Sequence, residues 1–307
     1  KTGGGGGWMT GQYDPKTNSV WWGTANPAPD YDYAGSKWAT EGARPGDNLY
    51  TSSLVALDVN TGQLKWHYQQ VPHDLWGYDV ASPPVLFTHD PQGKNIPAVG
   101  QAGKTGWFYA HDRATGKLLY KSDPFVPQWN MFEPATAEGT LIYPGVVGGS
   151  NWSPVAVDEG RRRVFVAGIH WPVEYKLHEI PAQAGKAAVK YSSMSPSEQE
   201  ERYGVLSSID LDTGKLKWQY KTQNPLVGGV LSTEGGLVFA GQGEGALNAY
   251  HSDTGAKLWS GKTDAGANAP PITYTLDGKQ YLAVAAGGNT LFGFKGGQKI
   301  HVWALKN

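Results

Sequence analysis

The stretch LVALDVNTGQLKWHYQ (54–69) decides the fold of this chain, because its pattern recurs. A short apolar strand ends in Ala-x-Asp, a Thr-Gly turn follows, and a Trp stands four residues after the Gly. A second clear copy lies at 210–218. Two other copies are weaker, with Tyr in place of the Trp in one and His in place of the Asp in the other. A repeat of strand, turn and Trp is typical of a β-propeller built from similar blades. The copies are Asp58-Thr61-Gly62-Trp66, Asp112-Thr115-Gly116-Tyr120, Asp210-Thr213-Gly214-Trp218 and His251-Thr254-Gly255-Trp259.

Composition excludes several classes of protein. The 307 residues carry a net charge of -1, which gives no electrostatic footprint for nucleic acid or for an anionic membrane. Cysteine is absent, so disulfides, thiolate metal sites and covalently attached haem c are excluded. No apolar run approaches the roughly 20 residues of a membrane helix, so no membrane span is expected. The 42 Gly, 20 Pro and 13 Trp suit many short strands joined by tight turns.

Strand patterns of period two run from Trp8 to the end of the chain and predict an all-β protein of four to five blades. The long gap between Thr115 and Thr213 is expected to hold one degenerate blade around 163–169 and an insertion at about 171–203. Within that insertion, SPSEQEERYG (195–204) gives the one helix signal, with Ser195 as its cap. Closed propellers have about four to eight blades, so the chain is a small propeller or part of a larger one.

Five segments in order resemble the pyrroloquinoline quinone (PQQ)-dependent alcohol dehydrogenases, which are periplasmic quinoproteins with eight-bladed propellers and Trp-docking motifs. The resemblance covers almost the whole chain but only the C-terminal half of the family, whose members are about twice as long. It implies one unit, 1–307, that forms half of an eight-bladed propeller and carries the loop insertion. The segments are GGGGGWMTGQYDPKTNSVWWGTANPAP (3–29), RPGDNLYTSSLVALDVNTGQLKWHYQQVPHD (44–74), GKTGWFYAHDRATGKL (103–118), GGSNWSPVA (148–156) and GGLVFAGQGEGALNAYHSDTGAKLW (235–259).

The resemblance implies a role for four residues. Trp8 matches the Trp that forms the floor beneath the quinone, where a flat indole can stack on a planar ring. Asn26 matches a metal ligand, and an amide oxygen suits a hard cation such as Ca²⁺. Lys104 matches a catalytic basic residue that reaches the quinone oxygens and can stabilise developing negative charge. Asn151 matches an amide that contacts the cofactor.

The segment PHDLWGYDVA (72–81) departs from the family pattern. The family has its catalytic base, an Asp, directly after the Trp, where this chain has Gly77. Two residues later, Asp79 matches an additional metal ligand of the lanthanide-using branch, and an extra carboxylate favours a trivalent ion. We assign Asp79 to the metal and to catalysis. Two possibilities for the base stay open: Asp79 or Asp74 replaces it, or ordinary alcohol oxidation has been lost.

Two further departures remove contacts from the expected pocket. Gly6 stands where the family usually has Thr, and Val227 stands where it has a Trp near the quinone. Two functions are therefore compared. One is a dehydrogenase that oxidises an alcohol or sugar hydroxyl by hydride transfer to PQQ, with Ca²⁺ or a lanthanide ion as Lewis acid. The other is a propeller that binds or scaffolds without redox chemistry, its quinone site decayed.

The resemblance also implies partners and a compartment. A half propeller exposes sheet edges and a broken ring of blade interfaces, so we expect either the N-terminal half or a second copy to complete it. The family passes its electrons to a soluble cytochrome or a similar acceptor, takes small alcohols or sugars as substrates, and is periplasmic. The identity of the substrate is not encoded in any readable motif.

Overall fold

The structure is a computed structural model that describes residues 3–30, 44–184 and 189–304. All regular elements of these residues are β-strands, in seven sheets. Four of the sheets are four-stranded antiparallel blades. Their strands are β2 (Gln12–Asp14), β3 (Ser19–Gly23), β5 (Ser53–Asp58) and β6 (Leu64–Gln69); β7 (Val85–His89), β8 (Ile96–Ala102), β9 (Phe108–Asp112) and β10 (Leu118–Lys121); β12 (Ala156–Asp158), β13 (Arg163–His170), β16 (Tyr203–Asp210) and β17 (Leu216–Thr222); and β18 (Val230–Ser232), β19 (Leu237–Gln242), β20 (Ala246–His251) and β21 (Lys257–Lys262).

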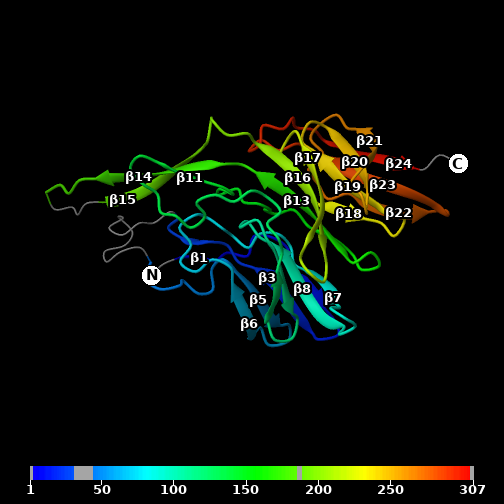
Figure 1. The fold of residues 1–307 in the computed structure, drawn as a ribbon, viewed down its shortest axis with the longest axis horizontal. Helices are drawn as coiled ribbons and strands as arrows, with labels where there is room; N and C mark the ends of the chain where they lie inside the picture. The colour runs from blue at the N-terminus through cyan, green and yellow to red at the C-terminus, as the bar shows by residue number, and fades with distance from the viewer. Residues whose placement is uncertain (1–2, 31–43, 185–188, 305–307) are drawn as a thin grey trace.

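Three smaller sheets complete the fold. A fifth sheet has three strands, and a second three-stranded sheet, called here the insertion sheet, extends beyond the blades at the left of Figure 1. The fifth sheet is β22 (Ile272–Leu276), β23 (Lys279–Ala286) and β24 (Lys299–Ala304); the insertion sheet is β11 (Thr140–Ile142), β14 (Val173–Ile180) and β15 (Val189–Pro196); and the last sheet pairs β1 (Gly3–Gly4) with β4 (Pro27–Ala28).

The repeated turn joins the third and fourth strand of every blade. In the first blade, Asp58 Oδ1 accepts hydrogen bonds from the backbone N–H groups of Asn60 and Thr61, both at 3.1 Å. Gly62 then takes a φ of 71°, which glycine adopts without steric cost. In the fourth blade His251 stands in for the Asp, and its Nδ1 accepts from the N–H of Asp253 at 3.2 Å. His251 therefore stabilises the same turn by accepting the hydrogen bond that the Asp accepts in the first blade.

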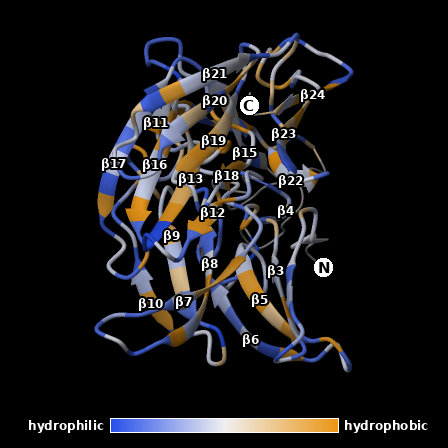
Figure 2. Ribbon diagram, turned by 90° about the vertical axis from the view of Figure 1, so that its right-hand side faces the viewer, coloured by the Kyte–Doolittle hydropathy of each residue, from blue (hydrophilic) through white to orange (hydrophobic). Residues whose placement is uncertain are grey.

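The closing aromatic residue of a blade docks on the turn of the next blade. The indole N–H of Trp66 donates to the Arg113 carbonyl at 3.1 Å, and that of Trp218 donates to the Ser252 carbonyl at 2.8 Å. A Cβ added at Gly116 or Gly255 would lie 2.6 Å from the docked ring, so glycine is required there. These contacts bury a large apolar surface between blades, which holds neighbouring sheets together. Figure 2 shows the apolar stretches in the middle strands β5, β13 and β19, with polar residues on the outer strand β6.

Two expectations about the long gap were wrong. Residues 163–169 are not a separate degenerate blade; they form β13, which pairs directly with β16 in the blade of Thr213. The expected helix at 195–204 is absent, because Ser195 pairs with Glu174 at the end of β15 and Tyr203 begins β16. That segment is charged all round and offers no apolar stripe, so strand pairing prevails over the local helix signal. Segment 171–203 leaves the third blade after its second strand and returns as its third.

The fifth sheet buries one face and exposes the other. Its inner face packs on the fourth blade, where Val284 is buried and Leu282 and Trp303 join the same core cluster. On the opposite face, Ile272 is 57% exposed and Ile300 is 73% exposed. Tyr274, Leu276 and Val302 are exposed on the same strands, so this face, called here the open apolar face, is continuous. The fifth sheet itself lies at the right of Figure 1.

In the described part of the chain, no helix has the length and hydrophobicity that crossing a bilayer requires.

Candidate functional site

The antiparallel order of the strands brings the candidate residues to one end of the blades. Connections between the second and third strands, and from one blade to the next, all emerge at the end opposite the Thr-Gly turns. Asn26 and Lys104 lie in connections of the first kind. Asp79 and Asn151 lie in connections of the second kind, and Trp8 precedes the first strand of the first blade. Topology therefore collects at one end residues that are far apart in sequence.

A tight turn after β6 carries Gly77 and Asp79, and Asp74 holds it. Asp74 Oδ1 accepts from the N–H groups of Trp76 and Gly77 at 2.8 and 3.0 Å, and Oδ2 accepts from Tyr78 N at 2.7 Å and Ser52 Oγ at 3.1 Å. The side chain is buried, and this burial raises the pKa of the carboxyl. With both oxygens engaged, Asp74 is built to cap the turn, and this geometry disfavours it as a replacement base.

Gly77 occupies a backbone conformation that suits glycine. Its φ is 81°, in the left-handed region. Its N–H donates to Asp74 and its carbonyl accepts from Lys104 Nζ at 2.8 Å. The position therefore has a defined backbone role but offers no proton acceptor from a side chain.

Asp79 and Lys104 form a buried ion pair beside Asn26. Lys104 Nζ lies 3.1 Å from Asp79 Oδ2, and the two side chains are 6% and 11% exposed. Asp79 Oδ1 accepts from the backbone N–H of Asn26 at 2.5 Å. The Asn26 amide nitrogen donates to the Pro27 carbonyl at 3.0 Å and to Asp30. The Asp79 carboxylate thus contacts the backbone of Asn26, whose side chain is held by Pro27 and Asp30, and an ammonium lies alongside.

Asn151 and Trp8 adjoin this cluster. The chain before Asn151 packs on the Lys104 loop, where Gly149 N donates to the Lys104 carbonyl at 2.6 Å. The Asn151 amide nitrogen donates to Val147, while its Oδ1 is buried and has no hydrogen-bond partner among the described residues. Trp8 contacts Trp152, the next residue, with ring centroids 6.2 Å apart at 73°, and is 47% exposed. A docking Trp would be more buried than this.

The two departures from the family pattern sit in different surroundings. Val227 is 1% exposed and packs in an apolar cluster with Trp76, Trp171 and Phe294. Gly6 is exposed, and its carbonyl accepts from Ala25 N at 3.0 Å, next to Asn26. Gly6 thus helps to hold the segment that carries the candidate ligand, whereas Val227 packs in the apolar core.

The described residues supply an incomplete set of metal ligands. No group of three or more His, Cys, Asp or Glu side chains converges within them. Ca²⁺ takes about six to eight oxygen ligands. Asp79 and Asn26 fit as two of these, and the remainder must come from elsewhere.

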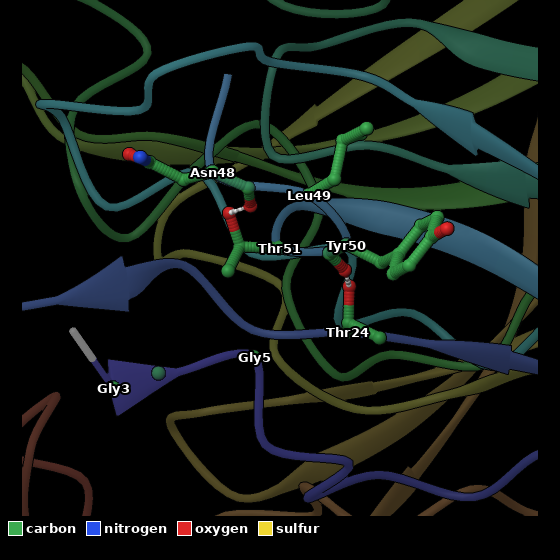
Figure 3. Close-up of a pocket in the computed structure, with 8 residues that line it drawn as sticks. Gly3, Gly5, Thr24, Asn48, Leu49, Tyr50 and Thr51 are labelled. Carbon is green, nitrogen blue, oxygen red and sulfur yellow. Dashed lines mark hydrogen bonds between the residues drawn. The ribbon is translucent and has the colours of Figure 1, made fainter. Parts of the chain in front are cut away.

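A shallow polar groove of about 260 Å³ lies next to the Asn26 segment. It is lined by Gly3–Gly5, Thr24 and residues 48–51. Figure 3 shows Thr24 Oγ1 donating to the Tyr50 carbonyl at 2.6 Å and Thr51 Oγ1 donating to the Asn48 carbonyl at 2.7 Å. Gly5 N donates to the Asn26 carbonyl at 3.0 Å, so the groove borders the segment that holds Asn26. None of the candidate residues lines it.

Sequence reasoning missed three residues that hold the turn. Arg44, fully buried, donates from Nη2 to the Asp74 carbonyl at 2.8 Å. The Tyr78 hydroxyl donates to the Pro144 carbonyl at 2.7 Å, and the Tyr175 hydroxyl donates to the Trp76 carbonyl at 2.8 Å. The RPGD segment at 44–47 hinted at Arg44, while nothing near Tyr175 in the sequence pointed to the turn.

Comparison with known proteins decides the family. The PQQ model described as the β-propeller domain of glucose, ethanol and alcohol dehydrogenases matches residues 1–131 and 126–282. The chain belongs to the PQQ-dependent dehydrogenase family. It is an all-β propeller and forms about half of an eight-bladed ring.

Relatives within the PQQ-dependent dehydrogenases match over nearly the whole chain. The quinoprotein alcohol dehydrogenase PedH of Pseudomonas putida is 35% identical over 94% of this chain and 50% of its own length. The quinoprotein ethanol dehydrogenase of Pseudomonas aeruginosa is 33% identical over 93% of this chain and 49% of its own length. The chain thus spans about half the length of the curated relatives it matches.

Solved structures of PQQ-dependent dehydrogenases share the fold. The quinohemoprotein alcohol dehydrogenase of Comamonas testosteroni superposes with a TM-score of 0.83 at 29% identity, over 98% of this chain and 48% of that one. A europium-containing methanol dehydrogenase superposes with a TM-score of 0.78 at 28% identity, over 93% of this chain and 52% of that one.

Proposed function

We propose that this chain, completed by the remaining blades, is a PQQ-dependent dehydrogenase that oxidises an alcohol or sugar hydroxyl. The observation that carries the proposal is the buried Asp79–Lys104 pair beside Asn26, at the end of the blades where Trp8 and Asn151 also lie. A buried ion pair costs desolvation energy and is weak evidence for stability alone, so its presence at this end of the blades supports a role in the site.

The donor atoms of these residues fit a quinone and a hard metal ion. Asp79 has lone pairs beyond those that face Lys104 and Asn26, and it would hold the metal together with the Asn26 amide oxygen. The orphaned Oδ1 of Asn151 needs a donor, and an N–H of the cofactor would supply it. Trp8 would stack beneath the ring. When bound, the quinone accepts a hydride from the substrate carbon and the metal polarises it as a Lewis acid.

Lys104 contributes a positioned positive charge. Two of its three N–H groups are engaged, by the Gly77 carbonyl and by Asp79 Oδ2. Among the described residues the third N–H group has no acceptor, and it would donate to a reduced quinone oxygen, whose developing negative charge it would stabilise. The ammonium needs no reorganisation for this, because Asp79 and Gly77 already hold it.

The choice between calcium and a lanthanide rests on Asp79. An additional carboxylate ligand such as Asp79 contributes more electrostatic binding energy to a trivalent ion than to a divalent one. The europium-containing methanol dehydrogenase among the structural neighbours supports the lanthanide reading. Location in the periplasm and electron transfer to a soluble cytochrome remain part of this proposal, the latter supported by the name of the quinohemoprotein from Comamonas testosteroni.

One observation favours a second function, a propeller that binds or scaffolds without redox chemistry. Gly77 stands at the position of the expected base, and no carboxylate in the turn replaces it directly, since Asp74 caps the backbone and Asp79 faces Lys104. In this reading the buried Asp79–Lys104 ion pair has a structural role only.

Quinone and metal content separate the two functions. We expect the native protein, purified with whatever completes its ring, to release one quinone and one calcium or lanthanide ion per propeller on acid extraction. Chromophore spectra and elemental analysis of the same sample would measure both. Absence of both, even after incubation with an excess of each, would favour the binding protein and contradict the dehydrogenase.

We also propose that the remaining blades, and not a second copy, cover the open apolar face of the fifth sheet. Two copies would bring eight complete blades and also two copies of the fifth sheet, more than an eight-bladed ring holds. The relatives are about twice as long as this chain, which leaves a length that fits the missing blades. A contiguous apolar surface of this kind marks an interface.

On its own, the chain is expected to self-associate through this face. The double variant Ile272→Lys/Ile300→Lys should lower the apparent mass in light scattering, because it charges two exposed positions of the face. Val59→Lys, at an exposed apolar position in the Thr-Gly turn of the first blade, is the matched control and should change nothing. A folded, monodisperse monomer of the unmodified chain would overturn this prediction.

A further inference from the structure

The insertion sheet reaches the candidate site through one buried tyrosine. Along β14, Glu174 and Lys176 are exposed while Tyr175 between them is fully buried, so the strand directs Tyr175 inward. The Tyr175 hydroxyl donates to the Trp76 carbonyl at 2.8 Å. The contact joins residues 99 positions apart in sequence. It fixes the peptide group between Trp76 and Gly77.

The segments on either side of β11 hold the same turn. The Trp76 indole N–H donates to the Glu133 carbonyl at 2.9 Å, and the Tyr78 hydroxyl donates to the Pro144 carbonyl at 2.7 Å. Trp76, Tyr78, Ile142 and Tyr175 share one apolar cluster. Gly77 is thus flanked on both sides by residues that are anchored to the insertion sheet and its approaches.

This anchoring matters because glycine has no conformational preference of its own to hold the turn. Gly77 adopts a φ of 81°, but a glycine has access to many other conformations. Its carbonyl is one of the two oxygens that hold Lys104 Nζ, the other being Asp79 Oδ2 at 3.1 Å. The direction of the Gly77 carbonyl therefore sets where the ammonium lies.

We propose that Tyr175 is a positioning residue: by fixing the Trp76–Gly77 backbone, it places Lys104 and Asp79 for the reaction. The inference rests on the proposed dehydrogenase function. In this proposal the insertion sheet helps to position catalytic residues, in addition to forming part of the surface of the protein. The insertion then compensates for the flexibility that Gly77 introduces.

Tyr175→Phe tests the proposal, with Tyr191→Phe as the matched control. Tyr191 lies on β15 of the same sheet and is 42% exposed. The first readout is hydrogen exchange of residues 74–79, whose Trp76, Gly77 and Tyr78 amides donate to Asp74. It needs no cofactor. We expect exchange in this segment to quicken about tenfold in Tyr175→Phe, the loss of one buried hydrogen bond, and to stay unchanged in Tyr191→Phe.

The second readout is steady-state kinetics of the assembled, quinone-loaded protein. Tyr175→Phe should lower kcat about tenfold with little change in KM, because it displaces Lys104 and the buried Tyr175 hydroxyl binds the Trp76 backbone. Tyr78→Phe, which breaks the bond to Pro144 on the other side of Gly77, should have the same effect and serves if the first variant misfolds.

The outcomes distinguish this inference from the function on which it rests. Unchanged exchange at 74–79 in both variants would overturn the positioning role, whether or not quinone is bound. Quickened exchange with unchanged kcat would overturn it too, because the turn would then not control the reaction. A protein that binds no quinone would defeat the dehydrogenase function, and the exchange experiment would still decide whether Tyr175 holds the turn.

Discussion

Replacing Asp79 with alanine is expected to lower the free energy of unfolding by about 3 kcal/mol and to abolish metal binding. The reason is the burial of its partner: Lys104 is 6% exposed on its side chain, and removal of Asp79 leaves a buried ammonium without its carboxylate. The Asn26 N–H also loses its acceptor. Denaturant unfolding of the assembled protein, and titration with calcium and with europium, would measure the two effects.

A surface ion pair provides the control. Glu201 lies 2.6 Å from Lys221, and both side chains are more than half exposed. Exposed pairs contribute at most about 1 kcal/mol, so Glu201→Ala should leave both stability and metal affinity nearly unchanged. If Asp79→Ala behaved like Glu201→Ala, the pair with Lys104 would not be the centre of the site.

The second large effect is a gain in catalytic activity. Gly77→Asp should raise dye-linked alcohol oxidation by about 100-fold or more, because general-base catalysis by a positioned carboxylate contributes roughly 10² to 10⁴. The side chain must accept a φ of 81°, which costs on the order of 1 kcal/mol for an Asp, a residue that tolerates this region better than most. A small loss of stability should therefore accompany the gain in rate.

Gly77→Asn is the matched control, because it carries the same backbone strain and nearly the same shape without a base. It should lose stability like the Asp variant and gain no activity. An unchanged rate in Gly77→Asp, with quinone and metal shown to be bound, would contradict the idea that Gly77 marks the missing base.

Local patterns predicted the blades well because each turn is made within a few residues. The Asp58 carboxylate and the Gly62 backbone are set by their own neighbours, so the Asp-x-x-Thr-Gly spacing is sufficient to find them. The resemblance to a known family supplied Trp8, Asn26, Lys104 and Asn151, and the topology brings them to one end of the blades. Their functional roles remain predictions.

Long-range contacts could not be predicted. The bond from Tyr175 to Trp76 depends on where a hairpin inserted in the third blade meets the turn after the first blade, which no local pattern encodes. The expected helix at 195–204 failed for the same reason, since pairing of Ser195 with Glu174 outweighs the local capping signal. Asp74 reads as an ordinary loop residue in sequence, and only the four hydrogen bonds to its carboxylate identify it as the cap of the turn.

The place of the insertion within the third blade has a consequence for folding kinetics. In the second and fourth blades every strand pairs with its chain neighbour through a short connection, so these sheets can form early. In the third blade, β13 must find β16 across the whole hairpin, and β3 must likewise find β5 across residues 24–52. Closing a longer loop costs more entropy, by about 0.6 kcal/mol for each doubling of its length. The second and fourth blades should therefore act as folding nuclei, with the first and third completing their sheets against preformed neighbours.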